Sequence, residues 1–76
     1  MRVYVLLGDY HLKNETNVFI TRNRALTYFY SKIRPYWIKK GFSANASEIE
    51  GGYQILITDS RDELVATYYI LRKRVI

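Results

Sequence analysis

One segment of the chain, residues 22–40, repeats its apolar side chains at helical spacing, and β-type runs flank it on both sides. The spacing is i, i+3, i+4, i+7, which places an apolar stripe along one side of an α-helix. Thr21 is suited to cap the start of this helix, and Gly41 to follow its end. The pattern predicts one amphipathic helix packed against strands. The stripe comprises Ala25, Leu26, Phe29, Tyr30, Ile33, Tyr36 and Trp37.

Pro35 interrupts this helical pattern. A proline inside a helix lacks the N–H of the regular hydrogen bond, and its ring clashes with the preceding turn. Proline is also favoured at the first position of a new helix. From the sequence, Pro35 therefore either kinks one long helix or starts a second short one, and both alternatives stay open.

The flanking segments predict strands. Residues 2–8 form an apolar, β-branched and aromatic run, which predicts a strand buried on both faces. Residues 11–16 are polar and predict a turn, and residues 18–20 predict a short second strand that pairs with the first. After the helix, residues 43–47 predict a polar connector. Residues 48–58 contain a Gly-Gly pair between two strand-like runs and predict a hairpin.

The C-terminal segment has two interpretations. Four consecutive β-favouring residues, 67–70, predict a long strand from Leu64 to Arg74. The alternative is a C-terminal helix, because Ser60 and Glu63 match a capping box. We favour the strand. The chain is then a single domain, residues 1–76, of the α+β class. An antiparallel sheet of four to five strands, in the chain order β-β-α-β-β-β, has one amphipathic helix packed across it.

The composition excludes several kinds of site. The 76 residues include no cysteine and one histidine, so disulfides, thiolate ligands and multi-histidine metal sites are excluded. His11 follows Asp9 by two residues, as an acid/base pair would, but an isolated turn histidine is the favoured interpretation. The acidic group at residues 59–63 lacks the length and glycine of a calcium loop and predicts turn chemistry. We predict a protein that is not an enzyme, with no catalytic residue, metal or cofactor.

Basic residues on the polar side of the predicted helix form the main candidate binding face. Arg24, Lys32 and Lys39 project there with Tyr28 between them, and the chain has a net charge of +5. Such a face is either an ordinary solvated helix surface or a docking surface for an acidic groove of a protein partner. Interleaved cations and aromatics are also suited to single-stranded nucleic acid, which is the alternative function.

A second basic cluster lies near the end of the chain. In a strand, Arg72 and Arg74 face one side and Lys73 the other. The cluster either protects an exposed sheet edge from aggregation or takes part in binding. Exposed strand edges would also allow a homodimer. The predicted partner-binding residues are Arg24, Tyr28, Lys32, Lys39, Arg72 and Arg74.

Three segments carry a resemblance to a known group of proteins. They are the run Arg2-Val-Tyr-Val-Leu-Leu-Gly-Asp-Tyr10, the run Val18-Phe-Ile-Thr-Arg-Asn-Arg-Ala25, and the final Thr67-Tyr-Tyr-Ile70. Together they resemble short accessory proteins encoded by tailed bacteriophages. The resemblance implies a protein of the host cell cytoplasm that binds and inhibits or modulates a host or defence protein. The absence of cysteine agrees with a reducing compartment, and no apolar run approaches the roughly 20 residues that span a membrane.

Overall fold

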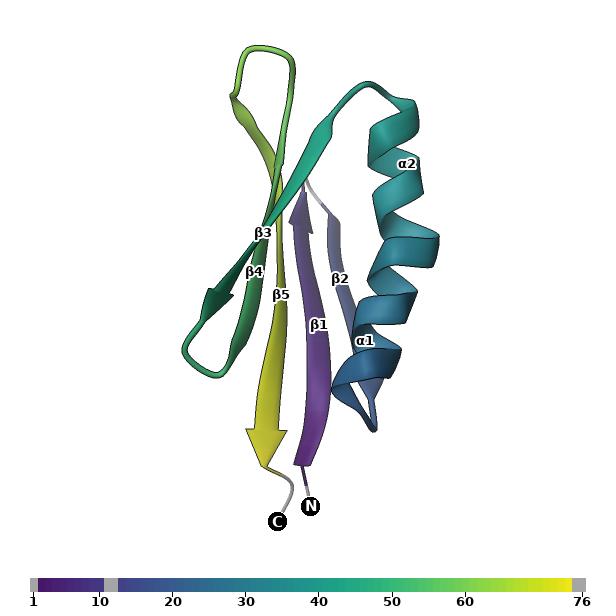
Figure 1. Ribbon diagram of the computed structural model, residues 1–76, viewed down its shortest axis with the longest axis vertical. Coiled ribbons are helices and arrows are strands. Elements are labelled where there is room, and N and C mark those ends of the chain that lie inside the picture. Colours follow the sequence, from purple (N-terminus) through teal and green to yellow (C-terminus); the bar gives the residue numbers. More distant parts are fainter. Residues whose placement is uncertain (1, 11–12, 75–76) are drawn as a thin grey trace.

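The protein folds into one five-stranded antiparallel sheet with a helix across one face (Figure 1). The computed structural model describes residues 2–10 and 13–74. The strand order in the sheet is β2-β1-β5-β4-β3. The strands are β1 (Arg2–Tyr10), β2 (Lys13–Phe19), β3 (Ser43–Ile49), β4 (Gly52–Thr58) and β5 (Leu64–Arg74). The helix consists of α1 (Arg22–Tyr28), a π-helical turn (Phe29–Ile33) and α2 (Arg34–Lys39).

This architecture confirms the predicted α+β class and the predicted chain order. The C-terminal segment is a strand, so the alternative of a final helix is wrong. Ser60 and Glu63 belong instead to the turn between β4 and β5, where the Asp59 carboxylate accepts hydrogen bonds from the backbone N–H groups of Arg61 and Glu63. None of the helices in the described part of the chain has the length and apolar character needed to cross a membrane.

The ends of the helix are capped as the sequence predicts. The Thr21 hydroxyl accepts a hydrogen bond from the backbone N–H of Arg24 at 3.2 Å, which satisfies one of the free donors of the first turn. At the other end, Gly41 adopts a φ of 88°, a conformation that glycine reaches without steric cost. The following N–H, of Phe42, donates to the carbonyl oxygen of Trp37. These caps fix the two ends of the helix.

The π-helical turn explains how the helix passes Pro35. The N–H of Arg34 donates to the carbonyl oxygen of Phe29, five residues earlier, and Pro35 then sits in the first turn of α2. In a regular α-helix, each step of four residues rotates the side-chain direction by about 40° more than one full turn. The wider π turn opposes this drift. As a result, four residues spaced by four all face the sheet and are buried: Ala25, Phe29, Ile33 and Trp37.

Two residues of the predicted apolar stripe are exposed. Tyr30 and Tyr36 keep 48% and 50% of their accessible surface, so their assignment to the core is wrong. The physical reason is that the buried residues of the helix are spaced by four, so that Phe29 and Ile33 lie at the centre of the contact with the sheet. Both tyrosines then lie beside this contact and not within it. Leu26 remains half-buried against the core, as predicted.

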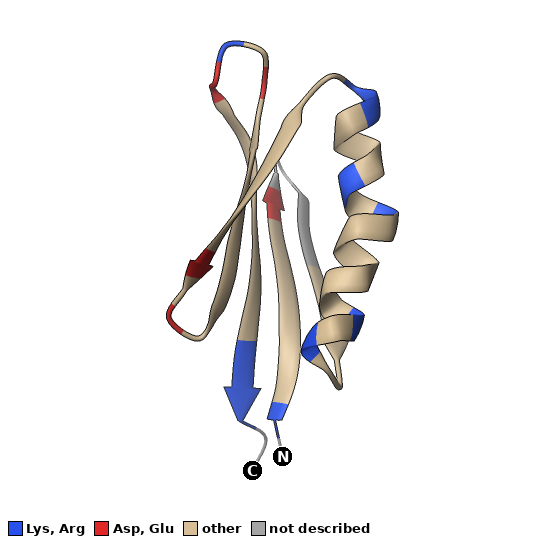
Figure 2. Cartoon of the chain, viewed as in Figure 1, with Lys and Arg blue, Asp and Glu red and all other residues tan. Residues whose placement is uncertain are grey.

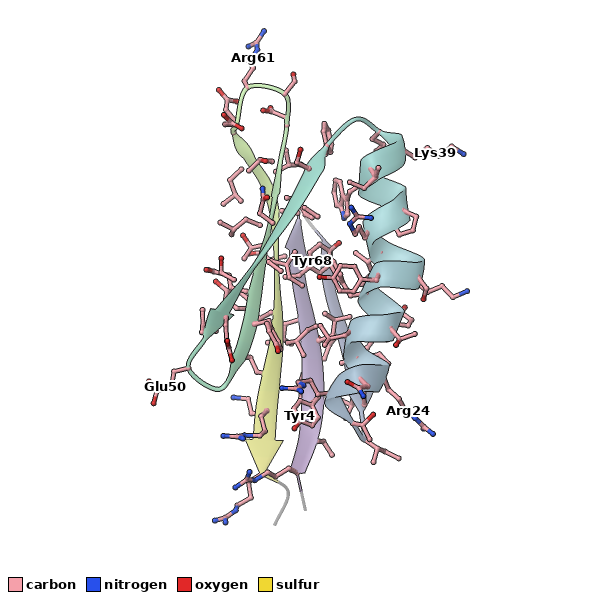
Figure 3. All side chains as sticks on the ribbon, in the orientation of Figure 1. Tyr4, Arg24, Lys39, Glu50, Arg61 and Tyr68 are labelled. Atoms are coloured by element: carbon pink, nitrogen blue, oxygen red, sulfur yellow. The ribbon has the colours of Figure 1, made fainter. Side chains whose placement is uncertain are left out.

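The core lies between the helix and one face of the central strands. Its largest side chains are those of Tyr68, on β5, and Phe29, whose rings meet edge to face at 5.5 Å. The indole N–H of Trp37 donates a hydrogen bond of 3.0 Å to the Tyr68 hydroxyl, so this buried polar pair is satisfied. Figure 3 shows Tyr68 reaching from the sheet toward the helix. Leu6, Ile55, Ile57 and Ile70 complete the contact.

Other strand predictions need correction. Residues 43–47 belong to β3 and are not a connector, because an edge strand with mostly exposed side chains has the composition of a loop. Residues 13–16, predicted as part of a turn, extend β2, while residues 11 and 12 lie outside the described part of the chain. The run 2–8 is not buried on both faces. Leu6 and Gly8 lie under the helix, whereas Val5 and Leu7 are only half-buried on the opposite face.

Gly8 provides a test of this packing. A Cβ atom at residue 8 would lie 2.5 Å from Cε1 of Tyr68, whose ring is fixed by Trp37 and Phe29. We expect Gly8→Ala to lower the free energy of unfolding by about 1–3 kcal/mol, the usual cost of overpacking. Urea denaturation measures this change. In a Tyr68→Leu background the same substitution should cost much less, and an equal cost in both backgrounds would refute the proposed clash.

Candidate functional site

The helix is uniformly basic. Residues 16–47 contain no Asp or Glu, and six cationic side chains lie between Arg22 and Lys40. In Figure 2 most basic residues are grouped on the helix and at the end of the sheet near the termini, while the acidic residues lie on the sheet and its turns, with Arg61 among them in the turn between β4 and β5. The two signs of charge are therefore separated across the molecule, which gives the helix a positive field. The six residues are Arg22, Arg24, Lys32, Arg34, Lys39 and Lys40.

Three predicted site residues lie along the helix as a row. Arg24, Lys32 and Lys39 are all exposed, and Figure 3 shows Arg24 and Lys39 pointing away from the sheet. Arg24 and Lys39 are separated by 15 residues, or about 22 Å along the helix axis at the helical rise. This arrangement cannot enclose a small ligand. It is suited to an extended anionic surface.

Tyr28, the fourth predicted site residue on the helix, is less exposed than the three cations. Its ring is half-buried and lies 5.3 Å from the ring of Phe19 on β2, at an angle of 46°. It also packs against the core cluster. Together with Arg24 and Thr27, these rings line a shallow groove of about 510 Å³ between the helix and β2. Tyr28 is therefore part of a groove wall and not a protruding ring.

The sequence interpretation missed the aromatic and aliphatic residues that the helix exposes. Tyr36 and Ile38 keep 50% and 41% of their surface, and Tyr30 keeps 48%. The ammonium group of Lys40 lies 4.6 Å from the centre of the Tyr36 ring, which is a cation–π contact. Exposed aromatic residues beside cations are typical of protein-binding surfaces. Their exposure depends on the π turn, which helical periodicity alone does not reveal.

Arg72 and Arg74 are joined by two arginines that the sequence interpretation did not select. In the antiparallel register of β1 and β5, Arg2 lies directly opposite Arg74. Arg22, at the start of α1, lines the same pocket of about 230 Å³ as Arg72. We call these four residues, Arg2, Arg22, Arg72 and Arg74, the basic end. Tyr4, Glu48 and Tyr53 also line the pocket.

The position of β5 decides between the two interpretations of its basic residues. β5 is the central strand, between β1 and β4, so protection of an exposed edge is not their role. Like charges directly opposite each other across two strands are destabilising. The pairing of Arg2 with Arg74 therefore carries a cost that an anionic partner would relieve.

The described acidic residues that were considered as metal ligands do not form a metal site. Within the described ranges, no group of three or more His, Asp or Glu side chains is placed to hold a metal ion. Asp59 has the predicted turn role, since both of its hydrogen bonds go to backbone N–H groups of its own turn. His11 lies outside the described residues.

Comparison with known proteins adds no relative to this description. No family model matches the chain, and neither a curated protein nor a solved structure matches it significantly.

The basic end predicts a measurable effect on stability. We expect Arg74→Glu to raise the free energy of unfolding by about 0.5 kcal/mol, because it replaces repulsion of Arg2 by attraction across the strands. Chemical denaturation at low salt measures the difference. Lys32→Glu, which changes the net charge equally on an exposed stretch of helix, is the control. An equal gain in both variants would assign the effect to net charge and contradict a specific repulsion.

Proposed function

We propose that this protein is a non-enzymatic protein-binding module, encoded by a bacteriophage, that binds and inhibits or modulates a host or defence protein. It acts by occupying an acidic surface of its target. The contact is made by the outer side of the helix, with Arg24, Lys32 and Lys39, and by the basic end, with Arg72 and Arg74. No bond is made or broken in this mechanism.

The concentration of positive charge on the helix and at the basic end carries this proposal. Residues 16–47 contain no acid, and the basic end places two arginines opposite each other in register. A positive surface of this kind accelerates association with an acidic partner and fixes its orientation. Arginine is suited to the contact because its planar fork binds a carboxylate through two hydrogen bonds.

The residues beside these cations favour a protein partner over a nucleic acid, whose backbone is a chain of phosphates. Glu48 lines the pocket beside Arg22 and Arg72, so two cations there face one anion. Two cations beside one anion are suited to binding a single carboxylate side chain of a partner. Glu48 would repel the closely spaced phosphates of a nucleic acid. The exposed Tyr30, Tyr36 and Ile38 of the helix supply the apolar contacts that protein interfaces use.

Nucleic acid remains a second candidate because of one specific observation. The rings of Tyr4 and Tyr53 line the pocket that holds Arg22 and Arg72. Single-stranded nucleic acid is bound by cations that follow the backbone and by aromatic rings that stack on bases. If this function holds, affinity for a short oligonucleotide falls steeply with salt concentration.

Charge reversal on the helix tests the proposed function. We expect Lys32→Glu/Lys39→Glu to reduce affinity for the target by about tenfold or more, since each lost attraction also becomes a repulsion. Circular dichroism should be unchanged, because both side chains are exposed. Immobilised protein is used to capture partners from a bacterial lysate, with and without nuclease treatment, and the affinity of the captured protein is then measured directly.

Controls distinguish the two candidates. Arg61→Glu, in the exposed turn between β4 and β5, matches the charge change of each single reversal and should leave binding intact. The protein-binding function is supported if the wild-type chain and Arg61→Glu both recover one protein from nuclease-treated lysate and the double variant Lys32→Glu/Lys39→Glu does not. Loss of all captured material after nuclease treatment would refute it in favour of nucleic acid.

A further inference from the structure

The face of the sheet opposite the helix carries a group of apolar side chains and is not covered by any described segment (Figure 1). Successive residues of a strand point to opposite faces. Because Leu6, Gly8, Tyr68 and Ile70 lie under the helix, the residues between them lie on the other face. We call this surface the open face. Its apolar residues on the three inner strands are Val3, Val5, Leu7, Leu56, Tyr69 and Leu71, all of which are half-buried.

From this surface we infer that two copies of the chain pack open face to open face, as a β-sandwich dimer. The inference is independent of the proposed function, because the basic helix lies on the other side of the sheet. A sheet with two apolar faces requires a layer against each of them. The helix supplies one layer. The run 2–8 has the composition of a strand buried on both faces, and a second copy would bury the face that the helix leaves open.

The area of the open face is sufficient for a specific dimer. The nine residues of β1 rise about 3.3 Å each, and the three inner strands and the edge strand β2, whose Val18 is paired with Val5 on this face, lie about 4.8 Å apart. The face therefore measures roughly 19 Å by 30 Å, or about 600 Å² per copy and about 1,200 Å² for two. This value is at the lower limit for specific interfaces, so we expect a dimer of micromolar to millimolar affinity.

The polar groups of the open face allow this packing. The Tyr69 hydroxyl accepts a hydrogen bond of 3.2 Å from the side-chain amide of Gln54, so these two groups already have a partner before they are buried. On the described strands the charged side chains of this face are Asp9 and Lys73, both exposed. Asp9 lies at one end of the central strand pair, and Lys73, which is opposite Val3, at the other end.

These two charges select one arrangement of the copies. A two-fold axis parallel to the strands would place like charges at the same end of the dimer. A two-fold axis perpendicular to the strands brings Asp9 of each copy to the end where Lys73 of the partner subunit lies, and this occurs twice. The axis then passes at the level of Leu6 and Ile70, which are paired in register. Val5 and Leu71 of one copy pack against Leu7 and Tyr69 of the partner subunit.

The first test is the molecular mass in solution. Sedimentation equilibrium of the full chain, from about 1 µM to about 1 mM, should show a mass that approaches twice the 9.1 kDa of one chain. Leu71→Lys, which places two cations near the axis, should raise the dimer dissociation constant at least about 100-fold. Ile38→Lys, the same kind of change on the exposed side of the helix, should have no effect.

Two results of this test would overturn the inference. One is a wild-type chain that stays monomeric over the whole concentration range. The other is a dimer that persists in Leu71→Lys, because such a dimer would form through the exposed edges of β2 and β3. The fluorescence of Trp37, which is buried, confirms that each variant is folded.

A charge exchange tests the arrangement without touching the apolar face. Asp9→Lys and Lys73→Asp each replace two attractions by two repulsions and should each weaken the dimer about tenfold. The double variant Asp9→Lys/Lys73→Asp should restore the wild-type affinity, because the opposite charges face each other again. Both residues are exposed, so the monomer stays folded. Additive weakening in the double variant would overturn the perpendicular axis.

Discussion

The hydrogen bond between the Trp37 indole and the Tyr68 hydroxyl ties the helix to the centre of the sheet. It joins α2 to the middle strand in a buried site, where an unsatisfied polar group would cost about 1–3 kcal/mol. Tyr68 can reach the helix because Gly8, on the neighbouring strand, has no side chain in the way. The edge-to-face contact of Phe29 then fixes the same ring from the π turn. One tyrosine therefore sets the position of the helix on β1 and β5.

Much of this arrangement can be read from the sequence, because burial leaves a periodic pattern. The spacing of Phe29, Ile33 and Trp37 predicts the helix, and the long β-favouring run predicts β5. The hairpin at residues 48–58 is predicted, but residues 43–47 of its first strand, β3, are predicted as a connector, because five of the seven residues of β3 are exposed and exposure removes the apolar pattern. The exposure of Tyr30 and Tyr36 was missed for a different reason. It depends on the π turn at Phe29–Ile33, and local periodicity assumes a uniform helix.

The basic end shows a further limit of local patterns. Arg72 and Arg74 are adjacent in the sequence to Lys73 and stand out as a cluster, whereas Arg2 lies near the start of the chain and Arg22 belongs to the helix. They meet because β1 and β5, at opposite ends of the chain, pair in an antiparallel register that places Arg2 against Arg74. A long-range register of this kind is fixed by which faces are buried. It becomes visible only when the strand order is known.

The two proposed surfaces lie on opposite sides of one sheet, and this has a consequence for binding. Packing through the open face would leave both helices of the dimer pointing outward, each with its full row of cations. A target with two acidic patches would then engage both helices, and the second contact would form at a high effective concentration. The charge of a single chain, +5, would be doubled in the dimer without any change in the contacts that each helix makes with the target. Dimerisation through the open face would in this way strengthen the electrostatic attraction between the basic helices and their target.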